Sequence, residues 1–374
     1  MMLQPGDPVP WFTLPSADGS PFALHAAAGR YVLLGFLGSA ARAETAAALA
    51  ALRAGRARFD DETACFFGIS VDAADRAEGR LVPELPGVRF LFDLDGAASR
   101  ACGVLRDDPR RDGVSVFRSC WMLLDPLLRV IETRPLAEAE AILARLRRLP
   151  PPALHAGFEA PPPVLILPRV FEPEFCRALI AHYEAEGGTP SGFMREVEGK
   201  TVGVFDPVVK RRRDCVIADE ALRAGARERI RRRVAPELRR VHHFEATRME
   251  RYIVACYDAV EGGHFAPHRD NTTAGTAHRR FAVTINLNAE EFEGGGLRFP
   301  EYGARSWRAP TGGAVVFSCS LLHQVLPVTA GRRYAFLPFL YDEAAARLRE
   351  ANNARLGEGV GAYRAVPAPE RAAG

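Results

Sequence analysis

The stretch YDAVEGGHFAPHRDNTT at residues 257–273 holds two histidines and an aspartate directly after a pair of glycines. Within it, His268 and Asp270 are two positions apart, and side chains at such positions of an extended segment point to the same side. An imidazole nitrogen and a carboxylate oxygen can therefore converge on one cation. A histidine near an aspartate is more often a hydrogen-bonded surface pair, so a metal site requires a further ligand from elsewhere in the chain.

His323 is the candidate for this further ligand, because it stands alone in the apolar, strand-like context FSCSLLHQVL. Two histidines and one carboxylate on one side of a β-scaffold form the facial triad, which leaves coordination positions open for non-heme Fe(II) chemistry. His264 is an alternative ligand, which we rank lower because it precedes the H-x-D pair. Ten residues after His323, Arg333 offers a guanidinium that can bind a carboxylate through two hydrogen bonds.

Short β-rich segments separated by Gly, Pro and Asn turns surround these residues from position 248 to about 342. This texture is typical of an antiparallel sandwich or barrel. The first third of the chain instead alternates buried-looking strands such as YVLLGFLG (31–38) with helical runs such as the Ala-rich 43–59. That alternation predicts an α/β layer fold.

Pro clusters at 150–152 and 161–163 indicate a stiff, extended connector between these two regions. The predicted organisation therefore has four parts. They are a domain at 1–149, a Pro-rich linker at 150–163, a domain at 164–345 and a C-terminal tail at 346–374, whose end we expect to be poorly ordered.

The composition excludes several classes of protein. The net charge of +3 with mixed signs demands neither nucleic acid nor an anionic membrane as a partner. No apolar run is long enough to span a membrane, and the first residues lack the pattern of a secretory signal. The seven cysteines are scattered and never form C-x-x-C, so we expect no disulfide framework or zinc knuckle and a cytoplasmic location.

Residues from about 164 to 342 resemble the Fe(II)/2-oxoglutarate dioxygenase superfamily, of the prolyl 4-hydroxylase-like type. The order H-x-D, then His, then Arg, at this spacing is specific, whereas a lone H-x-D is not. The matching stretches are LPRVFEPEFCRALI, RYIVACYDAVEGGHFAPHRD, TINLNAEEFEGGGLRF and APTGGAVVFSCSLLHQVLPVTAGRRYAF. The resemblance implies a double-stranded β-helix, or jelly-roll, of the α+β class.

The resemblance also implies roles for individual residues. His268, Asp270 and His323 would bind Fe(II), Arg333 would pair with the distal carboxylate of 2-oxoglutarate, and Tyr257 would line the cosubstrate pocket. The family motif favours Arg333 over Arg332, because the clamp stands just before an aromatic residue. Asn286, in TINLN, also belongs to this pocket, and it departs from the bulky aromatic that many relatives carry there.

The implied activity is hydroxylation of an unidentified substrate, a protein residue or a small molecule, with release of succinate and CO2. Fe(II), 2-oxoglutarate and O2 are the implied cofactor and cosubstrates, and ascorbate is a candidate further cofactor. The class includes dimers, so an oligomer is left open.

Residues from about 3 to 136 resemble an AhpC/TSA-type peroxiredoxin, a thioredoxin-like α/β fold. The resemblance rests on the opening QPGDPVPWFTLPSADGSPFALHAAAGRYVLLGFLGSAARAET and on FFGISVDAADRA, FLFDLDGAASRACGV and CWMLLDPLLRVIE. The catalytic thiol of that family would lie near the end of GFLGSAARAET, but this segment contains no cysteine. Cys102 fits a small buried residue better than a replacement nucleophile. We therefore expect a degenerate domain without peroxidase activity.

Two other functions are weighed against the oxygenase. A thiol redox protein would need a reactive cysteine in residues 1–150, and a non-catalytic interaction protein would not need the complete set of candidate ligands. Arginines also cluster in VVKRRRDCVI (208–217) and ARERIRRRVAPELRR (226–240). We interpret these clusters as solvated helix faces in which acidic residues are interleaved, and a nucleic-acid partner is not expected because no aromatic residues alternate with the arginines.

Overall fold

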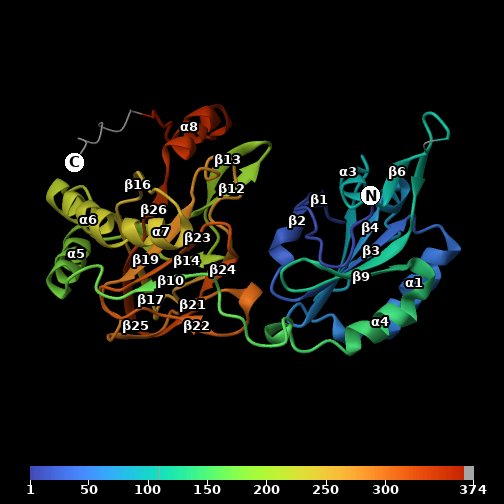
Figure 1. Cartoon of the computed structure of the whole chain (residues 1–374), viewed down its shortest axis with the longest axis horizontal. Coiled ribbons are helices and arrows are strands. Elements are labelled where there is room, and N and C mark those ends of the chain that lie inside the picture. Colours follow the sequence, from blue (N-terminus) through green and yellow to red (C-terminus); the bar gives the residue numbers. More distant parts are fainter. Residues whose placement is uncertain (109, 366–374) are drawn as a thin grey trace. The chain divides into compact units, whose positions relative to one another are not determined.

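The computed structural model describes residues 1–108 and 110–365. The chain divides into two units, drawn in Figure 1. Unit 1 comprises Met1–Pro162 with Pro300–Ala304, and unit 2 comprises Pro163–Phe299 with the described residues from Arg305 onward. None of the helices in the described ranges combines the length and the apolar composition that crossing a membrane requires.

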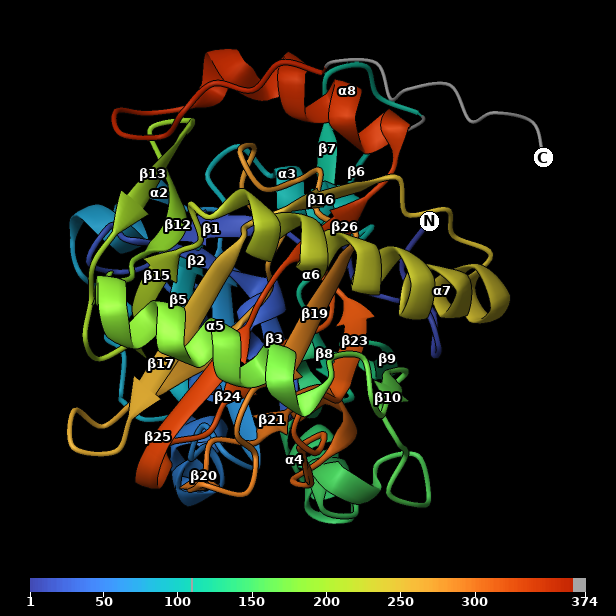
Figure 2. The same ribbon diagram turned by 90° about the vertical axis from the view of Figure 1, so that its left-hand side faces the viewer.

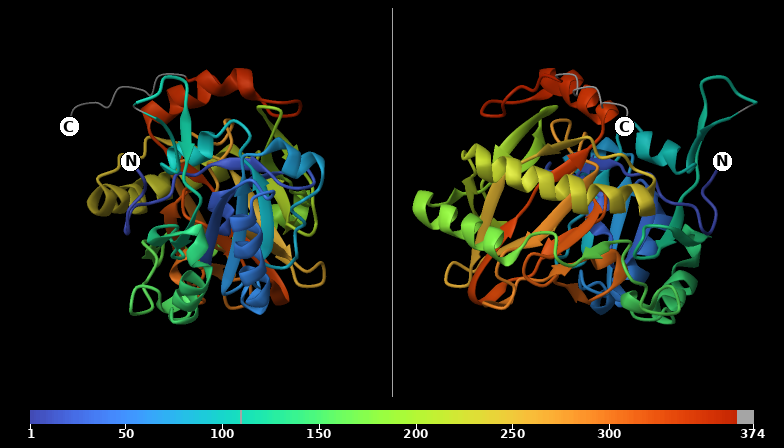
Figure 3. Two further views of the ribbon diagram at one scale, coloured as in Figure 1. Left: turned by 90° about the vertical axis from the view of Figure 1, so that its right-hand side faces the viewer. Right: turned by 60° about the vertical axis from the view of Figure 1, so that its left-hand side comes forward.

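A five-stranded mixed sheet forms the centre of unit 1, with the strand order β5-β4-β3-β8-β9. Its strands are β3 (Tyr31–Gly38), β4 (Ala64–Ser70), β5 (Val88–Phe92), β8 (Cys120–Leu124) and β9 (Val130–Pro135). The first three pair in parallel, whereas β8 and β9 are antiparallel to their neighbours. Every residue of β3 and β4 is buried, which explains why these strands are continuous apolar runs without polar alternation. The left panel of Figure 3 shows the strands side by side.

Helices α1 (Ala43–Ala54) and α4 (Ala139–Arg147) pack together against this sheet (Figure 1). Trp121 of β8 lies in their shared core, and its Nε1 donates to the carbonyl oxygen of Leu136 over 2.9 Å. The smaller elements of unit 1 are β1 (Thr13–Pro15), β2 (Pro21–Ala23), α2 (Ala73–Ala77), α3 (Ala97–Ala101), β6 (Leu105–Asp107) and β7 (Ser115–Phe117), with short 3-10 turns at Leu24–Ala27, Arg56–Arg58, Leu136–Glu138, Pro152–Leu154 and Pro300–Tyr302. The predicted thioredoxin-like α/β arrangement is confirmed.

Unit 2 is built on two antiparallel sheets, which confirms the predicted jelly-roll. The large sheet has the path β10-β23-β19-β25-β17-β15-β11, with three further strands attached to it. Its strands are β10 (Leu165–Leu167), β11 (Thr189–Pro190), β15 (Arg213–Val216), β16 (Arg248–Glu250), β17 (Ile253–Asp258), β19 (Phe281–Asn286), β20 (Phe292–Gly294), β23 (Ala314–Ser318), β25 (Val328–Phe336) and β26 (Phe339–Tyr341). The small sheet consists of β14 (Lys210–Arg211), β18 (His264–His268), β24 (His323–Val325), β21 (Leu297–Arg298) and β22 (Ser306–Trp307). A separate hairpin pairs β12 (Phe193–Val197) with β13 (Lys200–Val204).

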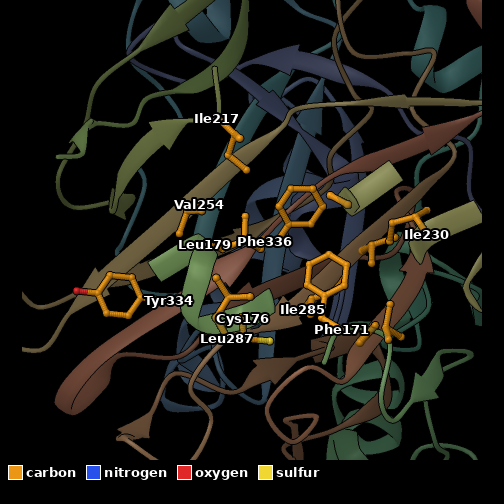
Figure 4. Packing of buried hydrophobic residues seen from close by; sticks show 14 of the residues in the cluster. Phe171, Cys176, Leu179, Ile217, Ile230, Val254, Ile285, Leu287, Tyr334 and Phe336 are labelled. Atoms are coloured by element: carbon orange, nitrogen blue, oxygen red, sulfur yellow. The ribbon is translucent and has the colours of Figure 1, made fainter. Parts of the chain in front are cut away.

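Three helices cover one face of the large sheet: α5 (Pro173–Glu186), α6 (Glu220–Arg233) and α7 (Ala235–His242). Figure 2 and the right panel of Figure 3 show α5 and α6 lying across the strands. Their apolar residues meet those of the sheet in one core, part of which is drawn in Figure 4, where Leu179 of α5 lies near Phe336 of β25. The helices leave the other face of the sheet free to contribute side chains to a site.

The predicted boundary between domain and tail at residue 346 falls inside a helix, α8 (Glu343–Ala351). This helix begins at an N-cap, because the carboxylate of Asp342 accepts a hydrogen bond from the backbone N–H of Ala345 over 2.8 Å. Further on, Tyr363 packs against the α8 cluster and exchanges two hydrogen bonds with Asn353. Residues 346–365 are therefore part of unit 2. The prediction that the end of the tail is poorly ordered concerns residues 366–374, which lie outside the described residues.

The carboxylate of Glu250, on β16, is buried among three cationic or titratable groups. Its oxygens lie 2.7 Å from Arg279 Nε, 2.8 Å from Arg349 Nη2 and 3.1 Å from His278 Nε2. Burial by itself would raise the pKa of Glu250, but the positive charge of Arg279 and the hydrogen bond from His278 outweigh it and hold the pKa well below its usual range. The network ties α8 to the sheet through Arg349.

We expect Glu250→Gln to lower the free energy of unfolding of unit 2 by about 3–5 kcal/mol, because the change leaves buried cations uncompensated. The pKa of Glu250 is lower in the folded chain, so its stabilising effect is complete above the unfolded pKa of about 4.3 and is lost as the pH falls below it. Urea denaturation between pH 7 and pH 3 should therefore show a steeper loss of stability in the wild type than in the variant. The exposed Glu228→Gln on α6 serves as the control and should change little; equal effects of the two substitutions would contradict the argument.

Candidate metal and cosubstrate site

His268 and His323 lie opposite each other on adjacent strands of the small sheet. They are direct Cα partners in the pairing of β18 with β24, and their ring centroids are 4.2 Å apart. The tight turn before β18 uses the glycine pair: Gly262 has a φ of 68°, and a Cβ on Gly263 would lie 2.7 Å from the backbone nitrogen of Asp258. The left-handed backbone favours glycine at position 262, and the close backbone leaves no room for a side chain at position 263, so the glycine pair permits the tight turn into β18.

Asp270 follows the end of β18 and brings its carboxylate between the two imidazoles. Its Oδ1 lies 3.6 Å from His268 Nε2, and its Oδ2 lies 3.4 Å from His323 Nε2. The three side chains each offer one ligand atom, and these atoms lie within 4.8 Å of one another. The pairing of β18 with β24 thus brings His323 beside His268, and Asp270 completes the group because it follows His268 by two residues.

The hydrogen bonds of the two imidazoles assign their tautomers. Nδ1 of His268 lies 2.8 Å from the carbonyl oxygen of Ala266, and Nδ1 of His323 lies 3.0 Å from that of Leu321. A carbonyl can only accept, so each Nδ1 carries the proton and each Nε2 presents its lone pair towards Asp270.

The local electrostatics keep these groups in the forms that bind a cation. Burial, followed by the neighbouring His268, lowers the pKa of His323 to about 4, so this imidazole is neutral at physiological pH. Burial acts to raise the pKa of Asp270, but the two imidazoles outweigh it and hold the pKa below its usual range. A neutral imidazole and an ionised carboxylate are the ligand states that metals require.

Arg333 lies on the large sheet, on β25, directly opposite Tyr257 of β17. Its side chain is buried, its Nε donates to Asn286 Oδ1 over 3.1 Å, and its Nη1 has no hydrogen-bond partner among the described residues. The guanidinium also lies over the Tyr257 ring, 5.1 Å from the centroid. Burial lowers the pKa of Arg333, as expected for a cation without a carboxylate partner.

Arg332, the neighbour of Arg333, points to the other side of β25. Its side chain is 58% exposed, and its Nε binds Asp258 Oδ2 over 2.8 Å. Asn286 is fixed as well, because its Nδ2 donates to the carbonyl oxygen of Ala309 over 2.8 Å and its Oδ1 therefore faces Arg333. Adjacent residues of β25 thus face opposite sides: Arg332 forms an ion pair at the surface, and Arg333 is buried with part of its guanidinium unbonded within the described residues.

One cavity joins the two groups of residues. Its wall includes His268, Asp270 and His323 from the side of the small sheet and Tyr257 and Arg333 from the large sheet. Arg212, Arg251 and Thr284 also line it, and the remaining lining side chains, which include Leu297, Phe317 and Val325, are apolar. Low polarity around a few convergent polar groups is typical of a small-molecule site.

His264 does not join the convergent group, although it stands on the same strand as His268. Its Nδ1 lies 2.8 Å from the carbonyl oxygen of Gly262, and its Nε2 lies 3.0 Å from that of Val208. Each ring nitrogen thus lies within hydrogen-bond distance of a backbone oxygen, and neither is among the convergent ligand atoms.

The interpretation of VVKRRRDCVI as a solvated helix face was wrong. The segment forms β14 and β15, in which Lys210 and Arg212 are buried while Arg211 is exposed. Arg212 lines the cavity and binds Asp214 and the hydroxyl of Tyr257. The alternation of charged residues facing in and out has the period of a strand, and that signal was present in the sequence. The α6 arginines do form a solvated face, as shown by the exposed ion pair of Arg231 with Glu228.

The loop of unit 1 between β3 and α1 contains Ser39, Ala40, Ala41 and Arg42, and no thiol. Ser39 Oγ donates to Asp72 Oδ2 over 2.6 Å, and the backbone N–H of Ala40 donates to a carboxylate oxygen of Asp75 over 2.7 Å. Cys102 is buried elsewhere in the unit, where burial raises the pKa of its thiol to about 12. No disulfide joins the seven cysteines, all of which lie in the described ranges.

Residues 252–341, which carry this constellation, match the model of the 2OG-Fe(II) oxygenase superfamily. The C-terminal part of the chain therefore contains a 2OG-Fe(II) oxygenase domain. Residues 5–130 match the model of the AhpC/TSA family, so the N-terminal part contains an AhpC/TSA domain. Both family resemblances of the sequence are confirmed.

Curated relatives are similar to about a quarter of the chain. A PKHD-type hydroxylase from Azoarcus sp. (strain BH72) is 33% identical over 105 residues, which is 26% of this chain and 44% of that protein. A PKHD-type hydroxylase from Cupriavidus metallidurans (strain ATCC 43123 / DSM 2839 / NBRC 102507 / CH34) is 34% identical over 95 residues, which is 23% of this chain and 42% of that protein. The chain thus spans less than half the length of these relatives.

Solved structures are similar to each part at low identity. Peroxidoxin BcpB from Mycobacterium tuberculosis is 24% identical with a TM-score of 0.34, over 40% of this chain and 99% of that chain. A prolyl hydroxylase in complex with a hypoxia inducible factor oxygen degradation domain peptide fragment, from Trichoplax adhaerens, is 18% identical with a TM-score of 0.39, over 50% of this chain and 86% of that chain.

Proposed function

We propose that this protein is an Fe(II)- and 2-oxoglutarate-dependent dioxygenase that hydroxylates a protein residue or a small molecule. One observation carries the proposal. The convergent ligand atoms of His268, Asp270 and His323 share a cavity with the buried Arg333, whose Nη1 has no partner among the described residues.

The donor set fits Fe(II). Two neutral imidazoles and one carboxylate are the facial ligand set of non-heme Fe(II) oxygenases, and three ligands leave coordination positions for a cosubstrate and O2. Arg333 fits a carboxylate at the opposite side of the cavity, because a buried guanidinium without a counter-charge is costly until an anion pairs with it. Among the described residues, Arg333 contacts an amide oxygen and an aromatic ring, neither of which neutralises it.

The residues of this chain have separate tasks in this proposal. His268, Asp270 and His323 would hold the metal, and Arg333 would bind the distal carboxylate of 2-oxoglutarate. Asn286 orients the Arg333 guanidinium through Nε, and Tyr257 supports its face. The apolar lining limits water. When bound, Fe(II) and 2-oxoglutarate activate O2, so that one oxygen atom enters succinate, the other enters the product hydroxyl, and CO2 is released.

Hydroxylation agrees with the names of the curated relatives, which are PKHD-type hydroxylases. Ascorbate as a further cofactor, an oligomeric state, the absence of a nucleic-acid partner and a cytoplasmic location stay predictions, as do the domain boundaries at 149 and 164. For the AhpC/TSA domain we propose a binding or stabilising role, because its loop between β3 and α1 contains no cysteine.

The proposal is tested by anaerobic loading of the full chain with Fe(II) and 2-oxoglutarate. A weak metal-to-ligand charge-transfer band in the visible range should appear, and it should require both additions. Absence of the band from folded protein would remove the oxygenase assignment and leave the chain as an interaction protein.

The alternative of a thiol redox protein makes an opposite prediction about the cysteines of unit 1. Burial raises the pKa of Cys65, Cys102 and Cys120 to about 12 in each case. We expect iodoacetamide at pH 7 to leave these thiols unmodified in the native chain and to modify them in denaturing urea, as mass spectrometry of peptides would show. Rapid labelling of any of the three in the native chain would restore the thiol redox alternative.

A further inference from the structure

The cavity holds more positive charge than the proposed metal and 2-oxoglutarate need. Arg212 and Arg251 line it together with the metal-site residues and Arg333. Lys210, Arg212, Asp214 and Arg251 form a basic cluster, in which the carboxylate of Asp214 interacts with all three basic side chains. Burial and the nearby Arg212 lower the pKa of Lys210 well below its usual value, so the arginines supply the positive charge. The hydrogen bonds of this cluster show which cation remains unbalanced.

Arg212 donates a short hydrogen bond to each carboxylate oxygen of Asp214. Its Nε donates to Oδ1 and its Nη2 to Oδ2, both over 2.7 Å, in the two-bond geometry that arginine and a carboxylate prefer. Ser191 Oγ also donates to Oδ2 over 2.6 Å. Lys210 binds only neutral oxygens, Ser191 Oγ at 2.8 Å and the Gly192 carbonyl at 2.6 Å.

Arg251 therefore forms only a longer hydrogen bond with Asp214. Its Nη2 reaches Asp214 Oδ2 over 3.2 Å, an oxygen that already accepts two shorter bonds. The guanidinium lies over the Phe339 ring, 5.3 Å from the centroid, which fixes its plane without neutralising it. Burial and the nearby Arg212 lower the pKa of Arg251 to about 10, so it stays charged at neutral pH.

The backbone at Arg251 is also unusual. Its φ is 66°, in the left-handed region that costs a non-glycine residue energy. The chain keeps a long cationic side chain at a position where glycine or asparagine would be easier. The conformation aims this side chain at the cavity, where it remains 27% exposed, in contrast to the enclosed Arg333.

The charges of the occupied site leave a single excess. The dipositive metal, the dianionic keto acid, Asp270 and Arg333 cancel one another. Arg212 and Asp214 also cancel as a bidentate pair. Glu250 also acts on Arg251, but its oxygens are bound to Arg279, Arg349 and His278, which leaves Arg251 as the cavity-lining cation in need of an anion. A monoanionic group is the complement, because a partly buried cation is stabilised most by a paired, hydrogen-bonded counter-charge.

We propose that the substrate carries a carboxylate and that Arg251 binds it, while Arg333 binds 2-oxoglutarate. This inference rests on the proposed function and narrows its substrate class to carboxylic acids, either free or as the side chain of an acidic residue. Within the described part of the chain the Arg251 side chain forms one hydrogen bond, through Nη2, so its Nε and Nη1 can form the new bonds.

The test uses the full chain, under anaerobic conditions, with Fe(II) and saturating 2-oxoglutarate so that Arg333 is occupied. The probes are free L-amino acids, the corresponding L-amino acid carboxamides, and N-acetyl-Asp and N-acetyl-Glu amides, whose carboxylate lies only in the side chain. Calorimetric titration and the shift in melting temperature report binding. We expect at least one carboxylate to bind and its neutral amide counterpart to bind at least about tenfold more weakly. Binding of the free amino acids alone would indicate a free carboxylic acid as substrate. Binding of the N-acetyl-Asp or N-acetyl-Glu amide would indicate the side chain of an acidic residue.

Arg251→Gln should lower the affinity for the carboxylate probe about tenfold to a hundredfold and leave the affinity for 2-oxoglutarate unchanged. Arg251→Lys keeps the positive charge but lacks the planar guanidinium. Its affinity for the carboxylate should lie between those of Arg251→Gln and the wild type. Arg211→Gln is the matched control, because Arg211 is the sequence neighbour of Arg212 in the basic cluster but is exposed and binds the carbonyl oxygens of Pro207 and Glu261. Melting curves of each variant verify that it is folded.

Three results would overturn the inference: no carboxylate in the panel binds, amides bind as tightly as acids, or Arg251→Gln retains wild-type affinity. Failure of the proposed function is a separate result, because it appears as a missing charge-transfer band before any probe is added. A band without carboxylate binding removes only the substrate class. Carboxylate binding that depends on Arg251 in a chain without the band would keep the anion site and remove the oxygenase.

Discussion

His268→Ala is expected to abolish the anaerobic charge-transfer band. The substitution removes one of three convergent ligands and leaves two, which lie 3.4 Å apart. Even the loss of an outer partner of a metal ligand costs roughly 10- to 100-fold in affinity, so the loss of a ligand itself should exceed that range. Fe(II) titration, followed by the band and by competition with a chelator, measures the effect.

His264→Ala provides the matched control, because it removes a histidine from the same strand. Both ring nitrogens of His264 bind backbone oxygens, so the variant should retain the metal affinity of the wild type. The reverse pattern, in which His264→Ala loses iron and His268→Ala keeps it, would place the metal elsewhere on β18. Circular dichroism and melting curves of both variants separate a lost ligand from a lost fold.

Arg333→Ala should weaken the binding of 2-oxoglutarate by roughly 30-fold or more, since truncating one partner of a buried charge pair costs about 2–5 kcal/mol. The substitution touches none of the three metal ligands, so Fe(II) should still bind. Titration of 2-oxoglutarate into the Fe(II)-loaded chain, monitored by the charge-transfer band, yields the dissociation constant. Arg333→Lys should recover only part of the loss, because an ammonium group cannot form the two parallel bonds.

Arg332→Ala controls for the removal of an arginine from the same strand. Arg332 is exposed and paired with Asp258, so its loss should change the affinity for 2-oxoglutarate little. If Arg332→Ala lowered the affinity for 2-oxoglutarate as strongly as Arg333→Ala, the effect would come from overall charge. The assignment of Arg333 as the residue that binds the distal carboxylate would then fail. If neither did, the carboxylate would be bound by another cation of the cavity, and Arg212 and Arg251 would be the next residues to change.

Much of the local chemistry was readable in the sequence. The H-x-D spacing placed His268 and Asp270 on one side of an extended segment, and the isolated His323 and Arg333 followed in the order of the family motif. Adjacent residues of a strand face opposite sides, and Arg332 and Arg333 do so in the structure. The absence of a cysteine from GFLGSAARAET was equally plain. These features depend on residue type and on short-range periodicity, which the sequence by itself determines.

The tertiary structure decided how distant segments meet. The pairing of β18 with β24 sets His268 against His323, and the pairing of β17 with β25 sets Tyr257 against Arg333. It also showed that KRRRD spans two short strands, β14 and β15, with Lys210 and Arg212 buried, and that the predicted tail begins within α8. Such contacts follow from strand register and sheet closure, which depend on how the whole core packs. A local pattern does not contain that information, so the basic cluster and the role of Arg251 emerged only from the fold.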